Sequence, residues 1–407
     1  MIEPVQEQTG APRITQGGDG RKEFQLLICA AKGAFDPGSA SETAALIGRG
    51  IDWDILLRMA KENAMLPLLH LHLEGLPARL VPARVRGQIK YGFDENHRNN
   101  LFLTAELLRL LKSFASYGVE AIPYKGPALA VAAYGNIALR RFADLDILVR
   151  RRDVPLARRL LEERGYEPEL KIPPAHEEAF QRVNYVRLFN RHDVGCVVEL
   201  HWAVAPRSFS FPLDTERLWE RLDYVELAGE RVPSLSREDQ LLLLCVHGAK
   251  DLWDRLEWVC GVAGVLHASA ADLDWPRLLR DARSLGAQRM LLLGLSLARD
   301  LLGAPLAHEA LRAIESDRAV KRLADTVRAR LMQPWPEISY SLPTRMMFHA
   351  RVRERARDKA RFCVRLLLTV THEDWEFASL PPRLSFLYLV LRPVRLARKY
   401  WVRQPEG

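Results

Sequence analysis

The chain has 407 residues, which is long for one ordinary core and predicts two or three domains. Hydrophobic residues make up 48% of it and charged residues 27%, fractions that argue against an integral membrane protein and against an extensively disordered chain. The net charge of +8 suits a phosphate-bearing partner. Nucleic acid is possible as a partner, but the charge does not support it, because the arginines are spread along the whole chain.

The cysteines and the N-terminal residues indicate the cellular compartment in which we expect the protein. The 5 cysteines contain no CxxC pair, which disfavours zinc ribbons and disulfide frameworks and indicates a reducing cytoplasm. Residues 1–22 lack the apolar segment of a signal peptide, and we expect a flexible tail there. P-loop, Rossmann and serine-hydrolase motifs are absent from the sequence, which disfavours those classes.

Residues 23–120 show mostly helical periodicity and are expected to form a helical N-terminal region. Its last segment, residues 96–118, has apolar residues at three- and four-residue spacing and ends at Gly118, which suits the position after a helix. This segment predicts a helix that leads directly into the next region.

Strands and helices alternate over residues 121–213, where we predict a small mixed β-sheet domain within an α+β fold. The expected order is a strand in "VEAIPYKG", a helix in "PALAVAAYG", a strand in "FADLDILV" and a helix in "VPLARRLLEERGY". The stretch "YVRLFNRHDVGCVVELHW" then predicts a hairpin, because a polar turn with Gly195 separates two strand-like runs.

Residues 214–345 are expected to return to helix as a C-terminal helical domain, with Ser236 as an N-cap and Asp239 three residues later. Residues 346–407 form a basic amphipathic C-terminal segment. Within it, residues 384–403 alternate apolar residues with arginines, which fits either peripheral membrane contact or, as we favour, docking on the protein's own core.

A pair of aspartates in "FADLDILV" is the first candidate for chemistry. Asp144 and Asp146 are two residues apart on a predicted strand, so their side chains emerge on the same face. Carboxylate oxygens are ligands for Mg²⁺ or Mn²⁺, and Mg²⁺ usually completes its shell with water and substrate phosphates. The alternative is a solvated strand end, which is the commoner origin of such a triplet.

The neighbouring residues favour a phosphate-bearing ligand. Lys125 and Gly126 follow a predicted strand and open a helix, where free backbone amides attract an anion and glycine allows close approach. Arg140 and Arg141 lie just before the aspartates and can hold phosphates in a bidentate manner. A solvated basic edge remains the alternative for each arginine.

A third carboxylate comes from the predicted hairpin. Glu199 and His201 are two residues apart in "VVELHW" and share a strand face. Glu199 can complete a two-cation site with the two aspartates. His201 can contact an acceptor or order Glu199, but we favour a packed, hydrogen-bonded histidine.

Further candidates lie in the C-terminal helical domain. His247, Lys250, Asp251 and Arg255 fall on neighbouring turns of a predicted helix and can share a face. That face either closes over an acceptor or is a solvated charged stripe. The candidates for contact with an acceptor are therefore His201, His247 and Arg255.

These motifs together resemble the nucleotidyltransferase superfamily that includes DNA polymerase beta. More narrowly, the motifs from "YKGPALAVAAYG" through "VVELHW" to "LCVHGAKDLWDRLEWVC" resemble nucleotidyltransferase family 5, an uncharacterised bacterial family. The likeness implies a nucleotidyltransferase-like domain that transfers a nucleoside monophosphate from an NTP to an acceptor and releases pyrophosphate. The commoner turn of the superfamily is Gly-Ser, whereas this chain has Lys125-Gly126.

The resemblance also implies residue roles. Asp144, Asp146 and Glu199 match the catalytic metal ligands for Mg²⁺ or Mn²⁺, and the nucleotide-binding positions fall on Lys125, Gly126, Arg140 and Arg141. The acceptor stays open among a small molecule, a peptide, a protein and RNA, and the sequence does not choose among ATP, GTP, CTP and UTP. The alternative function is a catalytically silent nucleotide- or RNA-binding module of the same fold, which has little reason to retain all three carboxylates.

Overall fold

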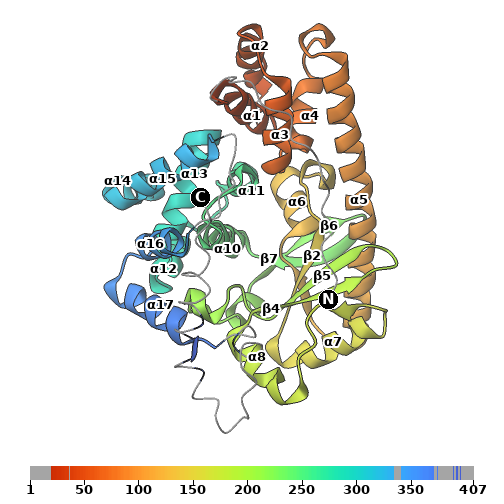
Figure 1. The fold of residues 1–407 in the computed structure, drawn as a ribbon, viewed down its shortest axis with the longest axis vertical. Coiled ribbons are helices and arrows are strands. Elements are labelled where there is room, and N and C mark those ends of the chain that lie inside the picture. Colours follow the sequence, from red (N-terminus) through yellow and green to blue (C-terminus); the bar gives the residue numbers. More distant parts are fainter. Residues whose placement is uncertain are drawn as a thin grey trace.

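The computed structural model describes residues 20–35, 37–333 and 341–370, together with Asp374, Tyr388, Leu391, Arg392 and Arg395. In this part of the chain a small mixed sheet is flanked by two sets of helices (Figure 1). The predicted α+β fold class is thereby confirmed.

The helices ahead of the sheet confirm the helical periodicity of the N-terminal region. Asp52 caps one of them, because its carboxylate accepts hydrogen bonds from the backbone amides of Asp54 and Ile55. They are α1 (Arg21–Gly33), α2 (Ala40–Gly48), α3 (Trp53–Glu62), α4 (Leu66–Glu74) and α5 (Ala83–Ser116). Helix α1 begins inside the segment predicted as a tail, the rest of which lies outside the described residues apart from Gly20.

Helix α5 is longer than predicted. It begins at Ala83 directly after Pro82, rather than near residue 96, and runs without interruption to Ser116. Gly118, with a φ of 74°, follows its end as the sequence predicted. In Figure 1 this helix runs along the whole side of the molecule and lies beside both the N-terminal helices and the sheet.

The main sheet has the strand order β1-β2-β5-β4-β3. Strands β2 and β5 are parallel neighbours, and the other pairs are antiparallel. The bounds are β1 (Ala121–Pro123), β2 (Asp144–Val149), β3 (Glu167–Pro168), β4 (Val186–Arg191) and β5 (Cys196–His201). The connecting helices are α6 (Gly126–Tyr134), α7 (Val154–Glu162) and α8 (Glu177–Val183). The predicted strands, helices and hairpin of this region are confirmed, while the two-residue strand β3 was too short to predict.

One face of the sheet is apolar and packs on helices. Leu145, Ile147 and Val149 of β2 join Val198 and Leu200 of β5 in a buried cluster with leucines of α5 and α7. Since successive side chains of a strand alternate between faces, the residues between these apolar ones face the opposite side. Burial of this face therefore directs the acidic residues of both strands toward the C-terminal helices.

The region from residue 214 to 345 contains a hairpin that was not predicted. Strands β6 (Leu222–Leu227) and β7 (Glu230–Leu235) pair in an antiparallel manner where we expected helix. Their turn is Ala228-Gly229, with φ values of 50° and 81°. Such a turn normally contains Asn-Gly or Asp-Gly, so alanine at its first position hid the hairpin.

The helices that follow are packed closely against one another and against α6. Gly264 of α11 allows this contact, because a Cβ there would lie 2.7 Å from Cβ of Ala133 in α6. Ser236 caps α10 by accepting a hydrogen bond from the amide of Asp239, as predicted. The helices are α10 (Arg237–Lys250), α11 (Leu256–Ser269), α12 (Trp275–Ser284), α13 (Gln288–Leu302), α14 (His308–Ser316), α15 (Arg318–Leu331), α16 (Leu342–Arg351) and α17 (Ala356–Leu368).

The chain breaks between α10 and α11, where we predicted a continuous helix with one charged face. Leu252 and Trp253 adopt left-handed conformations, with φ values of 62° and 56°. Trp253 is fully buried, and Gly248 leaves room for its ring, since a Cβ there would lie 2.6 Å from it. Packing of this tryptophan therefore accompanies the turn. Because the turn separates the two helices, His247 and Arg255 do not share a helix face.

Most of the basic segment 384–403 lies outside the described residues. Arg392 and Arg395, which are described, are buried and form ion pairs with Asp374 at 2.7 and 2.5 Å. None of the helices in the described ranges is both long and apolar enough to cross a bilayer.

Candidate active site

The parallel pairing of β2 and β5 places Asp146 directly opposite Glu199. Asp146 is buried, whereas Asp144, at the start of β2, and Glu199 are partly exposed. All three carboxylates lie on the face of the sheet opposite its apolar core, as the two-residue spacing predicts. The structure thus brings together residues that are more than fifty positions apart.

His201 lies between the carboxylates rather than on the surface. Its Nε2 lies 3.1 Å from Oδ1 of Asp146 and 3.0 Å from Oε2 of Glu199. Because ionised carboxylates only accept hydrogen bonds, this geometry assigns the proton to Nε2. Nδ1 lies 3.2 Å from the hydroxyl of Tyr124, which can donate to it. With 1% of its surface exposed, His201 is enclosed by Tyr124 and the two carboxylates.

Lys125 and Gly126 lie at the start of α6, next to the carboxylates. The ammonium of Lys125 lies 2.9 Å from Oδ1 of Asp146. Gly126 has a φ of 53°, and a Cβ there would lie 3.6 Å from the carbonyl oxygen of Asp144. Glycine therefore allows the turn that aligns Lys125 with the acidic strand.

The electrostatics of the two aspartates differ. Burial, together with the charges of Asp146 and Glu199, raises the pKa of Asp144 to about 6. Burial also acts to raise the pKa of Asp146, but Lys125 and His201 outweigh it and hold this pKa well below its usual range. Burial lowers the pKa of Lys125, whereas Asp146 more than reverses that effect. The charge of Asp146 is therefore well compensated by Lys125 and His201, whereas Asp144 lacks sufficient positive charge around it.

The predicted arginines have different surroundings. Arg140 forms a largely buried ion pair with Glu257 of α11, with Nη2 3.1 Å from Oε1. Arg141 is exposed and lines a groove of about 910 Å³ with Arg84 and Tyr91 of α5. In the described ranges no ion pair or hydrogen bond joins Arg141 to the three carboxylates.

The predicted acceptor-side residues of the helical domain are also separated. His247, on α10, lies 3.3 Å from Asp251 and lines a small cavity with Lys125, Arg140 and Glu257. Burial and the positive charges around it lower its pKa well below the usual range, so its ring is neutral near pH 7. Arg255 is exposed and precedes α11.

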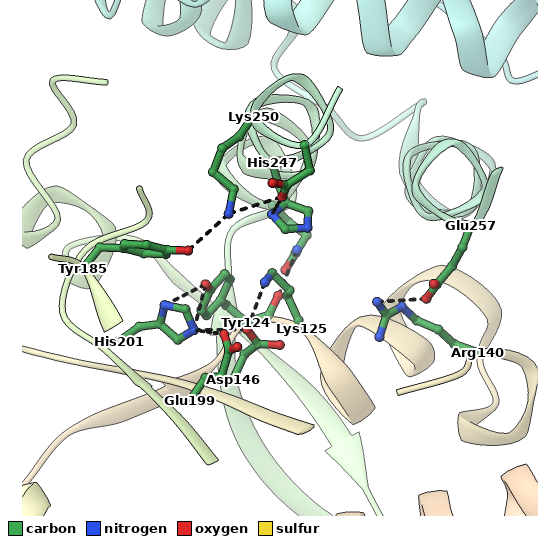
Figure 2. A network of polar contacts seen from close by, with 12 residues as sticks. Tyr124, Lys125, Arg140, Asp146, Tyr185, Glu199, His201, His247, Lys250 and Glu257 are labelled. Carbon is green, nitrogen blue, oxygen red and sulfur yellow. Dashed lines mark hydrogen bonds and ion pairs between the residues drawn. The ribbon is translucent and has the colours of Figure 1, made fainter. Parts of the chain in front are cut away.

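Several polar residues near the carboxylates were not among the predicted site residues. Tyr185 of the chain before β4 accepts a hydrogen bond from Lys250 at 3.2 Å, and its ring lies near that of His201 (Figure 2). Tyr124 and Glu257 are the others. Tyr124 directly precedes the Lys-Gly pair, which was a usable signal, whereas Tyr185 and Glu257 approach the site only through long-range packing.

Comparisons with known proteins were made for the whole chain. No curated protein matches the sequence. A solved structure, described as an antigenic nucleotidyltransferase-like protein from Paracoccidioides brasiliensis, is 15% identical, covers 51% of this chain and 95% of its own, and superposes with a TM-score of 0.34.

The family comparison covers the sheet, its carboxylates and the helices that face them. Residues 49–303 match the model of a family described as uncharacterised nucleotidyltransferase. This range contains all the predicted site residues and more than half of the sequence. The chain therefore belongs to this uncharacterised nucleotidyltransferase family.

Proposed function

We propose that the protein is a metal-dependent nucleotidyltransferase that moves a nucleoside monophosphate from an NTP to an acceptor. The observation that carries this proposal is the pairing of Asp146 with Glu199 across two parallel strands, beside the ammonium of Lys125. Acidic oxygens and a phosphate-binding cation on one face are the arrangement that transfer at an α-phosphorus needs. We also propose a cytoplasmic location, which the five free cysteines support.

The donor atoms of the site fit Mg²⁺ or Mn²⁺. Asp144, Asp146 and Glu199 offer the carboxylate oxygens that these ions prefer. One donor atom from each of Asp146, Glu199 and His201 lies within 4.8 Å of the others. Burial and then the charges of Asp146 and Glu199 raise the pKa of Asp144, and a cation would relieve the repulsion among the three carboxylates. We therefore assign the three carboxylates as cation ligands, with His201 orienting two of them.

A bound divalent cation would neutralise charge on the phosphates and make the acceptor group more acidic. The side chains of the chain have complementary tasks. Lys125 exchanges Asp146 for a phosphate oxygen when the nucleotide enters, while Gly126 lets the backbone approach the same phosphates. Arg140, fixed in place by Glu257, adds a second positive charge at this side of the site.

The transfer step is a displacement at the α-phosphorus. The acceptor oxygen forms a bond to that phosphorus, and the bond to the oxygen bridging the α- and β-phosphates breaks. Pyrophosphate leaves with the bonding electron pair, and the proton of the acceptor passes to Glu199 or to water. Catalysis of this kind consists mainly of positioning and charge neutralisation.

Label transfer tests the proposal directly. The full chain is incubated with each α-³²P-labelled NTP, Mg²⁺ or Mn²⁺, and a cell extract that supplies small-molecule, peptide, protein and RNA acceptors. We expect labelled acceptor and released pyrophosphate, and a loss of at least about a hundredfold in Asp146→Asn. Asp193→Asn is the matched control, since Asp193 is an exposed aspartate in the turn between β4 and β5.

The outcomes separate the two functions considered. Transfer that is absent, or equal in the wild type and Asp146→Asn, overturns the enzymatic proposal. Tight binding of an NTP without any transfer would instead favour a silent nucleotide-binding module. Calorimetry with the same nucleotides and ions supplies that second measurement.

A further inference from the structure

The predicted phosphate-binding cations are only partly available around the carboxylates. Lys125 contacts Asp146, Arg140 contacts Glu257, and Arg141 lines an exposed groove elsewhere. A triphosphate carries several negative charges. Because Lys125 and Arg140 already contact carboxylates, its binding calls for another cation.

Lys250 supplies such a cation from the C-terminal helical region. It is the last residue of α10, and 17% of its side chain is exposed. Its ammonium lies 3.2 Å from the hydroxyl of Tyr185 and 3.2 Å from a carboxylate oxygen of Asp251. Figure 2 shows this ammonium directed from α10 toward the group of residues that contains His201 and Asp146.

The path from Lys250 to the carboxylates is short. The ammonium of Lys250 lies 5.2 Å from the centre of the Tyr185 ring. The centre of the same ring lies 5.6 Å from the centre of the His201 ring. His201 in turn contacts Asp146 and Glu199. Lys250 therefore belongs to the polar wall opposite the sheet and not to a solvated stripe on α10.

The surroundings keep this ammonium charged although it is largely buried. Burial lowers the pKa of Lys250, but Asp251 and Tyr185 more than offset that effect, and the pKa is raised. Position at the carboxyl end of a helix also stabilises a positive charge. Lys125 and Arg140 line one small cavity with His247, and burial followed by the charges of Lys125, Lys250 and Arg140 lowers the pKa of that ring.

We propose that Lys250 binds the β- and γ-phosphates of the nucleotide, so that α10 forms the second wall of the triphosphate site. This inference rests on the proposed function and deepens it by naming a phosphate-binding residue outside the sheet. Lys125, Arg140 and Lys250 each contact a carboxylate, and a polyanion that replaces these partners gains a contact from each side of the site.

A purely structural role for Lys250 gives a different expectation. If the ammonium only tied α10 to Tyr185, its removal would lower stability and leave phosphate binding unchanged. Lys250→Met removes both the charge and the hydrogen bond, whereas Lys250→Gln keeps an amide donor for Tyr185 and removes only the charge. The second variant also serves if the first does not fold.

The test uses the full chain and inorganic tripolyphosphate with Mg²⁺ as the probe, measured by calorimetry. We expect Lys250→Met and Lys250→Gln to weaken tripolyphosphate binding by about tenfold or more, because a charge-assisted contact is lost. Binding of a nucleoside monophosphate should change by less than about twofold, and Lys250→Arg should retain most of the tripolyphosphate affinity. Lys112→Met is the control, since Lys112 is exposed and paired with Glu230 of β7.

Two results would overturn the inference. One is tripolyphosphate binding by Lys250→Gln equal to that of the wild type, and the other is a wild-type chain that does not bind tripolyphosphate. The label-transfer assay separates these from failure of the proposed function. If transfer persists while Lys250→Gln binds tripolyphosphate like the wild type, only the role of Lys250 is wrong. If both transfer and NTP binding are absent, the proposed function itself is wrong.

Discussion

The ammonium of Lys125 and Nε2 of His201 contact the same oxygen of Asp146, at 2.9 and 3.1 Å. We propose the carboxylate of Asp146 as a cation ligand. The lysine and the cation therefore compete for Asp146 unless phosphates draw the lysine away. Cation binding and triphosphate binding should accordingly strengthen each other.

Replacement of Lys125 by methionine should uncouple the two ligands. We expect Lys125→Met to bind Mn²⁺ roughly tenfold more tightly than the wild type when no nucleotide is present, because the competing charge is gone. The same variant should bind tripolyphosphate more weakly. Titration of Mn²⁺ followed by electron paramagnetic resonance gives both the affinity and its dependence on tripolyphosphate. Lys90→Met, at an exposed lysine of α5, is the control, and unchanged Mn²⁺ affinity in Lys125→Met would exclude competition.

The raised pKa of Asp144 predicts a pH dependence with a defined sign. Its folded-state pKa, about 6, exceeds the ordinary value of 3.8, so the folded chain binds the extra proton between these values. Ionisation of Asp144 thus makes the cation-free protein less stable as pH rises from about 4 to 6. Cation binding has the opposite dependence and should weaken as pH falls below about 6.

Asp144→Asn should separate these effects. The variant lacks the buried charge, so we expect a gain of roughly 1 kcal/mol in the free energy of unfolding at pH 7, without divalent cations. The gain should shrink toward zero as the pH falls to 4, and transfer activity should be lost throughout. Urea unfolding at several pH values in the presence of a chelator measures the first effect. A variant less stable than the wild type at pH 7 would contradict it.

The faces of the two acidic strands were predictable, whereas the relation between the strands was not. Asp144 and Asp146 share a face because side chains alternate along a strand, and the same rule applies to Glu199 and His201. Adjacency of β2 and β5 depends on the whole connection through α7 and the hairpin, which local patterns do not encode. The resemblance to a known family supplied that step.

The missed features of the helical region have local causes. The turn of the β6–β7 hairpin uses Ala228 in a left-handed conformation that alanine seldom adopts, so its sequence lacks the usual turn signal. The break after α10 contains neither glycine nor proline at its left-handed positions, Leu252 and Trp253. The sequence left open whether the face of Lys250 closes over an acceptor or is a solvated charged stripe, because Tyr185 and His201 approach it from the sheet.

His201 is expected to act as a positioning residue for Glu199 and Asp146. His201→Gln keeps one hydrogen-bond donor but cannot reach both carboxylates and Tyr124 in the same geometry. Loss of such a partner behind cation ligands typically costs about 10- to 100-fold in metal affinity or activity. Mn²⁺ affinity and the rate of label transfer measure the two effects separately. The control is His192→Gln, at an exposed histidine of the neighbouring turn, and a variant at position 201 with wild-type Mn²⁺ affinity would remove the positioning role.

The close contact between α11 and α6 should make Gly264 sensitive to size. A Cβ at this position would lie 2.7 Å from Cβ of Ala133 and 2.9 Å from its carbonyl oxygen, so both helices would have to move apart. Overpacking of this kind typically costs about 1–3 kcal/mol, and we expect Gly264→Val to lower the free energy of unfolding by that amount. Because α6 carries Lys125 at its start, tripolyphosphate binding should weaken as well.

A matched control for Gly264 lies one helical turn away. Gly261 is on the same helix, and a Cβ there would meet no atom within 4 Å. Alanine is a better helix former than glycine by about 1 kcal/mol, so Gly261→Ala should stabilise the protein slightly or leave it unchanged. Chemical denaturation of both variants gives the comparison. Equal stability of Gly264→Val and Gly261→Ala would mean that α11 and α6 can separate without cost.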